Sequence, residues 1–246
     1  CFGYEYLKYD CIRIFITGEN TRPNFEECDY AFSFDFPNSE RNYRLPLYRL
    51  YKGYDDLLKP RTPDVVLNQD RKFCSFLVSN DVPDARIHLF DLLSEYKKVD
   101  SGGKFRNNIG NPVPRGEEIS WLGNYKFNIT FENSSYPGYT TEKLMHALVS
   151  NTIPIYWGNP LVGQDFNTGS FINCHDYNTL EDVLSLVKDI DGDPALYNNI
   201  LSQPFLPGGE EIPGNREENI VARFAQIFSE GYEFVSKSIK RSQRLK

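Results

Sequence analysis

The chain has 246 residues, of which 40% are hydrophobic, enough for one large domain or two small ones around a real core. Its formal net charge of −7 argues against nucleic acid as the main partner. No apolar run reaches the length of a membrane span, and no signal peptide is evident. We therefore expect a cytoplasmic protein, with peripheral membrane contact through its basic C-terminal tail left open.

The five cysteines are odd in number and form no C-x-x-C pair, so we expect reduced, mostly buried thiols in a reducing compartment. They are Cys1, Cys11, Cys28, Cys74 and Cys174. The three histidines lack metal-ligand spacing, and the chain contains no P-loop or G-x-G-x-x-G motif. Common metal and phosphate-loop enzymes are thereby disfavoured.

The first third of the chain carries few regular elements. "CIRIFITGEN" (11–20) is a β-branched run that ends in a turn, and "DYAFSFDF" (29–36) reads as a second strand. The aromatic, proline-bounded stretch 45–63 is predicted to be an irregular connection. Two strands without a strong helix indicate an incomplete lobe that ends at a boundary near residues 64–70.

From residue 71 onward, predicted strands and helices alternate. The strands are 71–80, 125–133, 152–158 and 170–177; the helices are 85–99, 141–149 and 179–190, the last with Thr179 as its N-cap; 100–116 and 204–215 are loops; and 217–240 is a long amphipathic helix. Alternation of this kind predicts a mostly parallel sheet with helices on both faces. Ligands of such sheets bind beyond the carboxyl ends of the strands.

The stretch "YTTEKLMHALV" places a lysine, Lys143, in the first turn of a predicted helix. That end of a helix is electropositive, so a lysine is unfavourable there unless an anion lies beside it. Free N–H groups and Lys143 could together bind a phosphate, with Glu142 on ribose hydroxyls and Tyr139 adding a ring and a hydroxyl. The alternative is a capped helix with both charges in solvent.

Two further residues fit a nucleotide-sugar transfer. Arg106 lies in the glycine-rich "SGGKFRNN", where glycines would let the backbone approach a ligand and guanidinium could grip a diphosphate without metal. Glu19, in "TGEN", ends a strand of the other lobe and could act as a general base. A solvated arginine and an acid that caps a turn are the respective alternatives.

The stretch "YKFNITFENSSYPGYTTEKLMHALVSNTIPIYWGNP" resembles the signature of the α1,3/4-fucosyltransferases, glycosyltransferase family 10, and its flanks resemble the bacterial members. The resemblance implies an α/β fold of GT-B type, with two Rossmann-like lobes and a cleft between them. It implies GDP-fucose as donor and inversion at the anomeric carbon. On this resemblance, Glu19 is the catalytic base, and the donor-binding residues are Arg106, Asn133, Tyr139, Glu142 and Lys143.

Three regions follow from this interpretation: a partial acceptor-side lobe (1–68), a GDP-sugar-binding lobe (69–215), and a C-terminal helix with its basic tail (216–246). The expected acceptor is O3 of N-acetylglucosamine in a Galβ1,4GlcNAc unit, giving a Lewis X-like product. No metal or cofactor is expected to be required. A catalytically inactive nucleotide-sugar or glycan-binding module, and the same fold with another donor, are the alternatives.

Overall fold

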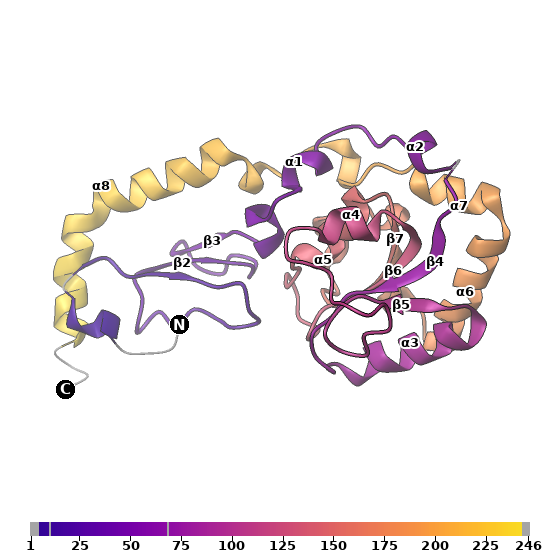
Figure 1. Ribbon diagram of the computed structural model, residues 1–246. Coiled ribbons are helices and arrows are strands. Elements are labelled where there is room, and N and C mark those ends of the chain that lie inside the picture. The colour runs from indigo at the N-terminus through magenta and orange to yellow at the C-terminus, as the bar shows by residue number, and fades with distance from the viewer. Residues whose placement is uncertain (1–4, 10, 68, 243–246) are drawn as a thin grey trace.

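The computed structural model (Figure 1) describes residues 5–9, 11–67 and 69–242, without the side chains of residues 7, 65 and 232–242. The chain forms two lobes, each built on its own parallel sheet. This two-sheet α/β arrangement is the fold expected from the sequence.

The first lobe contains three parallel strands in the order β1-β2-β3. They are β1 (Ile14–Ile16), β2 (Tyr30–Ser33) and β3 (Asn42–Arg44), preceded by the 3-10 helix η1 (Glu5–Lys8). The first two were predicted, whereas β3 was missed because it has only three residues and a polar sequence. Its place is set by pairing with β2, where Phe32 lies opposite Tyr43.

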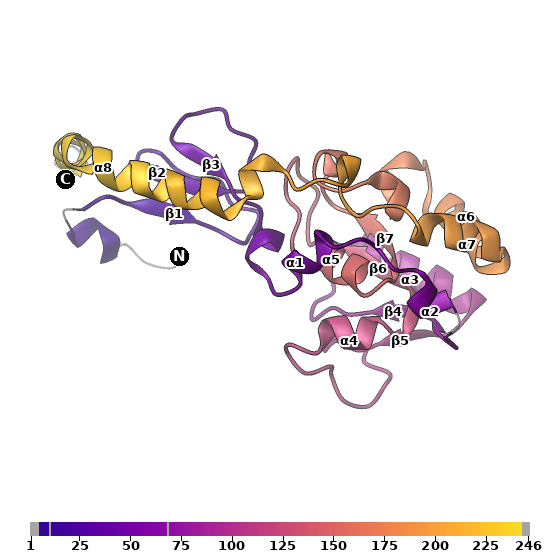
Figure 2. The same cartoon turned by 90° about the horizontal axis from the view of Figure 1, so that it is seen from above.

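The long C-terminal helix α8 (Glu217–Ser242) returns to cover this small sheet, and Figure 2 shows it lying across β1–β3. The ring of Phe224 stacks on that of Phe32 with centroids 4.2 Å apart, and Ile227 is fully buried beside them. The helix predicted over 217–240 is thus confirmed. The side chains of the predicted basic tail lie outside the described residues.

The connection between the sheets is more ordered than predicted. It contains the 3-10 helix η2 (Leu47–Leu50) and two one-turn helices, α1 (Tyr54–Leu57) and α2 (Asp64–Leu67). Tyr48 and Tyr54 are buried against the second lobe, with their rings stacked 6.3 Å apart. The aromatic residues that made this stretch look irregular are therefore the ones that anchor it.

The second lobe contains a five-stranded parallel sheet in the order β5-β4-β6-β7-β8. Its strands are β4 (Lys72–Phe76), β5 (Val99–Ser101), β6 (Tyr125–Phe131), β7 (Ile153–Trp157) and β8 (Ile172–Asn173). The sequence placed β5 across a helix end and a loop, which is wrong. This edge strand is short and centred on Asp100, a buried carboxylate that accepts hydrogen bonds from Lys72 and Tyr125.

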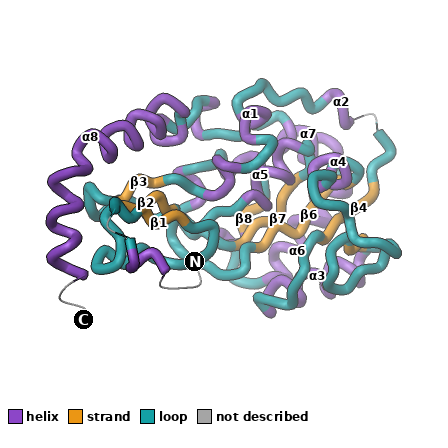
Figure 3. The backbone as a smooth tube through the Cα atoms, turned by 60° about the vertical axis from the view of Figure 1, so that its left-hand side comes forward, coloured by secondary structure: helices purple, strands orange, loops and turns teal. Residues whose placement is uncertain are grey.

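Helices cover both faces of the larger sheet, as predicted, and Figure 3 shows the strands running between them. One face carries α3 (Asp84–Tyr96), α6 (Leu180–Gly192) and α7 (Pro194–Leu201); the other carries α4 (Glu118–Leu122) and α5 (Glu142–Val149). Thr179 caps α6 and forms a reciprocal capping box with Asp182, which confirms the predicted start of that helix.

The strand order reverses at β4, because the chain next adds β5 on one side and then β6 on the other. At such a switch point the connecting loops leave in opposite directions, and a crevice opens beyond the carboxyl ends of the strands. The fold therefore positions a ligand site between the ends of β4 and β6.

The described cysteines are reduced: Cys28, Cys74 and Cys174 are buried and Cys11 is exposed. Burial raises the pKa of the Cys28 thiol to about 11, so it is inert as a nucleophile. Cys1 lies outside the described residues. Within the described residues, no helix has the length and apolar character needed to cross a bilayer.

Candidate active site

A cleft of about 630 Å³ lies beyond the carboxyl ends of β4, β5 and β6, at the start of α5. It is the crevice that the strand order predicts. Its charged lining residues are the cations Arg86, Lys104, Arg115 and Lys143 and the acids Glu118 and Glu142. The excess of positive charge in a chain that is acidic as a whole favours an anionic ligand.

Lys143 lies at this cleft beside an anion of the protein itself. Glu132, fully buried just after β6, accepts hydrogen bonds from the backbone N–H and hydroxyl of Thr141, both at 2.7 Å, and from Lys143 Nζ at 3.1 Å. Burial alone would lower the pKa of Lys143, but the charges of Glu132 and Glu142 outweigh it and raise that pKa. Lys143 is therefore fixed as a cation on the cleft wall.

Arg86 is a second cation of the cleft, and sequence reasoning did not find it. Its side chain is fully buried and donates to the Phe131 carbonyl oxygen and to Asn133 Oδ1, each at 2.9 Å, and to Asn80 Oδ1 at 3.2 Å. Burial lowers its pKa to about 10, so it remains charged at neutral pH. Arg86 occupies the first turn of α3 and thus shows the same electrostatic signal that drew attention to Lys143.

The predicted donor-binding residues Asn133, Glu142 and Lys143 all line the cleft. Two come from the start of α5, and Asn133 is positioned by its bond to Arg86. Sequence proximity in "FENSSYPGYTTEK" brings these three side chains to one wall. The other lining cations, Lys104 and Arg115, come from the loop after β5, and neither was predicted.

Arg106 lies elsewhere. Its guanidinium forms an ion pair with Asp91 on α3 and lies over the Phe90 ring, 5.3 Å from its centroid, and it is not among the residues that line the cleft. The predicted clamp of Arg106 and Lys143 is thus not assembled in this arrangement. A diphosphate role for Arg106 requires it to leave Asp91, and that role stays a prediction.

The glycines near Arg106 have a different use from the one predicted. A Cβ on Gly103 would lie 1.8 Å from the Val78 carbonyl oxygen, and one on Gly102 would lie 2.7 Å from the Trp121 ring. The missing side chains therefore let the loop after β5 pack on the loop after β4 and on α4. They shape the cleft wall through protein contacts.

Glu19 and Tyr139 both lie where the two lobes touch, and neither of them lines the cleft. Tyr139 is buried, with its ring 5.1 Å from that of Phe34 in the first lobe; burial, together with the Glu132 charge, raises its pKa to about 12. Glu19 is exposed on the loop after β1, and its charge also acts on the Tyr139 hydroxyl. The adjacent Asn20 donates to Ser134 Oγ at 2.6 Å, which fixes this loop against the second lobe.

No described residue donates a hydrogen bond to the Glu19 carboxylate, in contrast to the alternative in which it caps a turn. Within the described part of the chain, no group of three or more His, Cys, Asp or Glu residues could hold a metal ion. The Asp191 carboxylate at the end of α6 is buried and accepts a hydrogen bond from Lys126 Nζ at 2.9 Å.

Two lobes built on separate parallel sheets, with a cation-lined cleft at the strand switch point of the larger sheet, define the class: an α/β protein of the GT-B fold. The family models agree. Residues 67–202 match the C-terminal domain of glycosyltransferase family 10 (fucosyltransferase), and residues 1–51 match the N-terminal domain of alpha-(1,3)-fucosyltransferase FucT. The chain belongs to glycosyltransferase family 10.

Among curated relatives, the chain is 38% identical over 209 residues to the alpha-(1,3)-fucosyltransferase FucT of Helicobacter pylori, covering 72% of this chain and 43% of that protein. It is 31% identical to a putative fucosyltransferase of Acanthamoeba polyphaga mimivirus, covering 90% of this chain and 38% of the relative. The chain thus spans less than half the length of either relative.

Solved structures give the same relationship. A crystal structure of alpha1,3-fucosyltransferase with GDP-fucose superimposes with a TM-score of 0.73 at 32% identity, over 88% of this chain and 74% of that one. Another crystal structure of alpha1,3-fucosyltransferase gives a TM-score of 0.76 at 30% identity, over 92% of this chain and 74% of that one.

Proposed function

We propose that the protein is an inverting fucosyltransferase that moves L-fucose from GDP-fucose to O3 of N-acetylglucosamine in a Galβ1,4GlcNAc unit, giving a Lewis X-like product. The cation-lined cleft at the strand switch point carries this proposal. The similarity to FucT of Helicobacter pylori and to a solved structure with GDP-fucose supports the donor and the linkage.

In this proposal the diphosphate lies against Lys143 and the start of α5, with Arg86 behind it. Both cations are held by fixed partners, so they are in place before negative charge develops on the leaving GDP. Glu142, on the same helical turn as Lys143, would accept hydrogen bonds from the ribose hydroxyls. Arg106 would join the diphosphate once released from Asp91.

Glu19 would act as the general base. It lies on the loop after β1, which Asn20 bonds to Ser134 of the second lobe, and from there it would take the proton from an acceptor hydroxyl as that oxygen attacks the anomeric carbon. GDP would leave from the opposite face of the sugar, which inverts the configuration. Asn133 would contact the fucose from the cleft wall, while a donor contact of the buried Tyr139 stays a prediction from the family signature.

The transfer is proposed to need no divalent metal, because protein cations already face the diphosphate. The protein is proposed to act in the cytoplasm, with membrane contact only through its basic C-terminal tail. The donor is tested by comparing the shift in melting temperature produced by GDP-fucose, GDP-mannose and UDP-sugars. We expect the largest shift with GDP-fucose.

Catalysis is tested by GDP release from GDP-fucose with and without N-acetyllactosamine, in EDTA. We expect acceptor-dependent release by the unmodified chain and a loss of about 10²–10⁴-fold in Glu19→Gln with GDP affinity retained. Glu26→Gln, an exposed acid further along the same loop, is the matched control and should keep full turnover. Donor binding without acceptor-dependent release would instead identify a non-catalytic binding module.

A further inference from the structure

A second cavity, of about 490 Å³, lies in the first lobe where it meets the second. Arg22 reaches it from the loop after β1, Asp35 and Phe36 from the segment after β2, and Tyr136 from the loop between β6 and α5. It thus lies at the carboxyl ends of the small parallel sheet, the position at which such sheets bind ligands. The activity proposed above assigns it no role.

The Arg22 side chain is held in place by its neighbours, but not all of its N–H groups have a hydrogen-bond acceptor in the described part of the chain. Its guanidinium lies between the rings of Tyr136 and Phe34, 3.4 and 4.5 Å from their centroids, and Nη2 donates to Asn20 Oδ1 at 2.7 Å. Nε lies 3.1 Å from Asp35 Oδ1 in an ion pair, and both Nε and Nη1 are buried without a hydrogen-bond partner among the described residues. A fixed arginine with an unused N–H offers a preorganised donor to a ligand.

Asp35 supplies the complementary acceptor. Its carboxylate pairs with Arg22 and receives no hydrogen bond from any described residue, and burial raises its pKa. A hydroxyl group donates one hydrogen bond and accepts others, so neighbouring sugar hydroxyls can use an Arg–Asp pair on both sides. Because the two charges cancel, the pair favours a neutral sugar over an acidic one.

The walls are aromatic. Phe36 and Tyr136 line the cavity, and Tyr136 leaves 39% of its surface exposed. Rings of this kind pack against the apolar C–H faces of a pyranose while the polar groups take its hydroxyls. Aromatic walls with one Arg–Asp pair are therefore suited to a single neutral sugar ring.

Two loops connect this cavity to the proposed transfer site. The loop after β1 carries both Arg22 and Glu19, and Asn20 between them bonds to Ser134. The loop before α5 gives Tyr136 to this cavity and Asn133 to the donor cleft. A saccharide bound beside Arg22 would thus extend past Glu19 toward the donor.

Resting on the proposed fucosyl transfer, we propose that this cavity is an acceptor subsite that binds a neutral pyranose one unit away from the sugar that receives fucose. The bound ring packs on Tyr136, and its hydroxyls bond to Arg22 and Asp35. The subsite thereby selects an oligosaccharide acceptor over a single sugar.

The test compares N-acetyllactosamine with N-acetylglucosamine as acceptors, by kcat and KM for GDP release. Tyr136→Ala and Asp35→Asn should each raise the KM for the disaccharide roughly tenfold while leaving the KM for the monosaccharide and the affinity for GDP unchanged. Tyr136→Phe keeps the ring and should behave as the unmodified chain. Glu26→Gln, exposed and outside both cavities, is the control.

Equal effects on both acceptors, or none on either, would overturn the subsite while leaving the proposed transfer intact. No acceptor-dependent release by the unmodified chain would instead count against the proposed transfer. In that event, saturation-transfer NMR of N-acetyllactosamine gives a separate result: a signal lost in Tyr136→Ala supports the subsite, and a signal equal in both proteins overturns it.

Discussion

At the scale of single residues, the position of Lys143 in the first turn of α5 is explained by Glu132. This carboxylate lies at the positive end of the helix and takes both Thr141 donors as well as Lys143. Gly158 makes room for it, because a Cβ there would lie 2.5 Å from Glu132 Cγ. The position of Lys143 therefore did indicate a neighbouring anion, and one such anion is the buried Glu132 of the protein itself.

Glu132→Gln should destabilise the fold by about 3 kcal/mol, since removing one partner of a buried ion pair leaves the other uncompensated. The shape of the side chain is kept, so the loss reports charge and hydrogen bonding alone. Urea unfolding measures it, with the exposed Glu117→Gln as the matched control. A loss of less than about 1 kcal/mol in unfolding free energy would mean that water replaces Glu132 as the hydrogen-bond acceptor of Lys143 and Thr141.

The two predicted phosphate cations can be separated by GDP affinity. Lys143→Ala should weaken GDP binding by roughly 10- to 100-fold, because a charge-assisted bond to phosphate is lost. Asp91→Asn removes the present partner of Arg106 and should strengthen GDP binding if Arg106 joins the diphosphate. Calorimetry measures the Kd of GDP for both variants. An unchanged Kd in Lys143→Ala would contradict the role of Lys143 in the clamp. An unchanged Kd in Asp91→Asn would mean that Arg106 does not bind the diphosphate.

At the scale of helices and strands, the elements that could be predicted from the sequence are those with a long, regular pattern of buried apolar residues. The apolar runs of β6 and β7 and the periodic, capped α6 were found for that reason. By contrast, β3 and β5 have three residues each, and only their neighbours in the sheet make them strands.

The same distinction applies to the site. Asn133, Glu142 and Lys143 lie close together in the sequence, so their motif could be read directly. Arg86 reaches the cleft by contacts with residues 45 and 47 positions away, which no local pattern encodes. Its place depends on how α3 packs against β6.

The loop after β5 provides an element-scale prediction. Gly103→Ala should displace this loop, because the new methyl group would overlap the backbone of Val78. Backbone cannot swing aside as a side chain can, so we expect a loss of about 1–3 kcal/mol in unfolding free energy and weaker GDP binding. Gly192→Ala, at the end of α6 with no atom within 4 Å, is the control and should be neutral.

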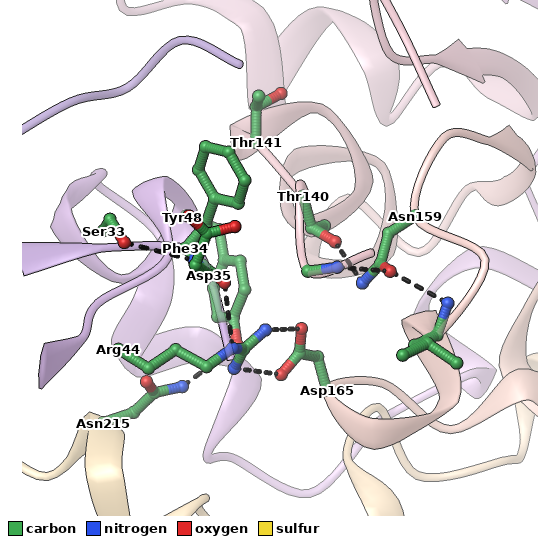
Figure 4. A network of polar contacts seen from close by, with 12 residues as sticks. Ser33, Phe34, Asp35, Arg44, Tyr48, Thr140, Thr141, Asn159, Asp165 and Asn215 are labelled. Atoms are coloured by element: carbon green, nitrogen blue, oxygen red, sulfur yellow. Dashed lines mark hydrogen bonds and ion pairs between the residues drawn. The ribbon is translucent and has the colours of Figure 1, made fainter. Parts of the chain in front are cut away.

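At the scale of the whole molecule, the lobes meet through close and specific contacts. A Cβ on Gly138 of the second lobe would lie 2.5 Å from the Phe34 carbonyl oxygen of the first. Arg44 on β3 donates to both carboxylate oxygens of Asp165, at 2.7 and 2.6 Å, and also to the Phe34 carbonyl oxygen (Figure 4). These contacts fix the two lobes against each other, and with them the loop that carries Glu19.

The Arg44–Asp165 pair is buried on both sides, with 13% and 1% of the side chains exposed. Asp165→Asn should therefore cost about 3–5 kcal/mol in unfolding free energy, because Arg44 would keep a buried charge without a partner. Asp56→Asn breaks an exposed pair with Lys59 of similar length, 2.6 Å, and should cost less than about 1 kcal/mol.

Arg44→Met with Asp165→Leu removes both charges and should recover much of that loss, since an apolar pair leaves no unpaired group. If the ion pair sets the lobe angle as well as the stability, the double variant will remain folded in urea titrations yet lose turnover. GDP affinity should persist in it, because every charged residue that lines the cleft belongs to the second lobe. A double variant with full turnover would show that Gly138 and the aromatic contacts suffice to hold the lobes in place.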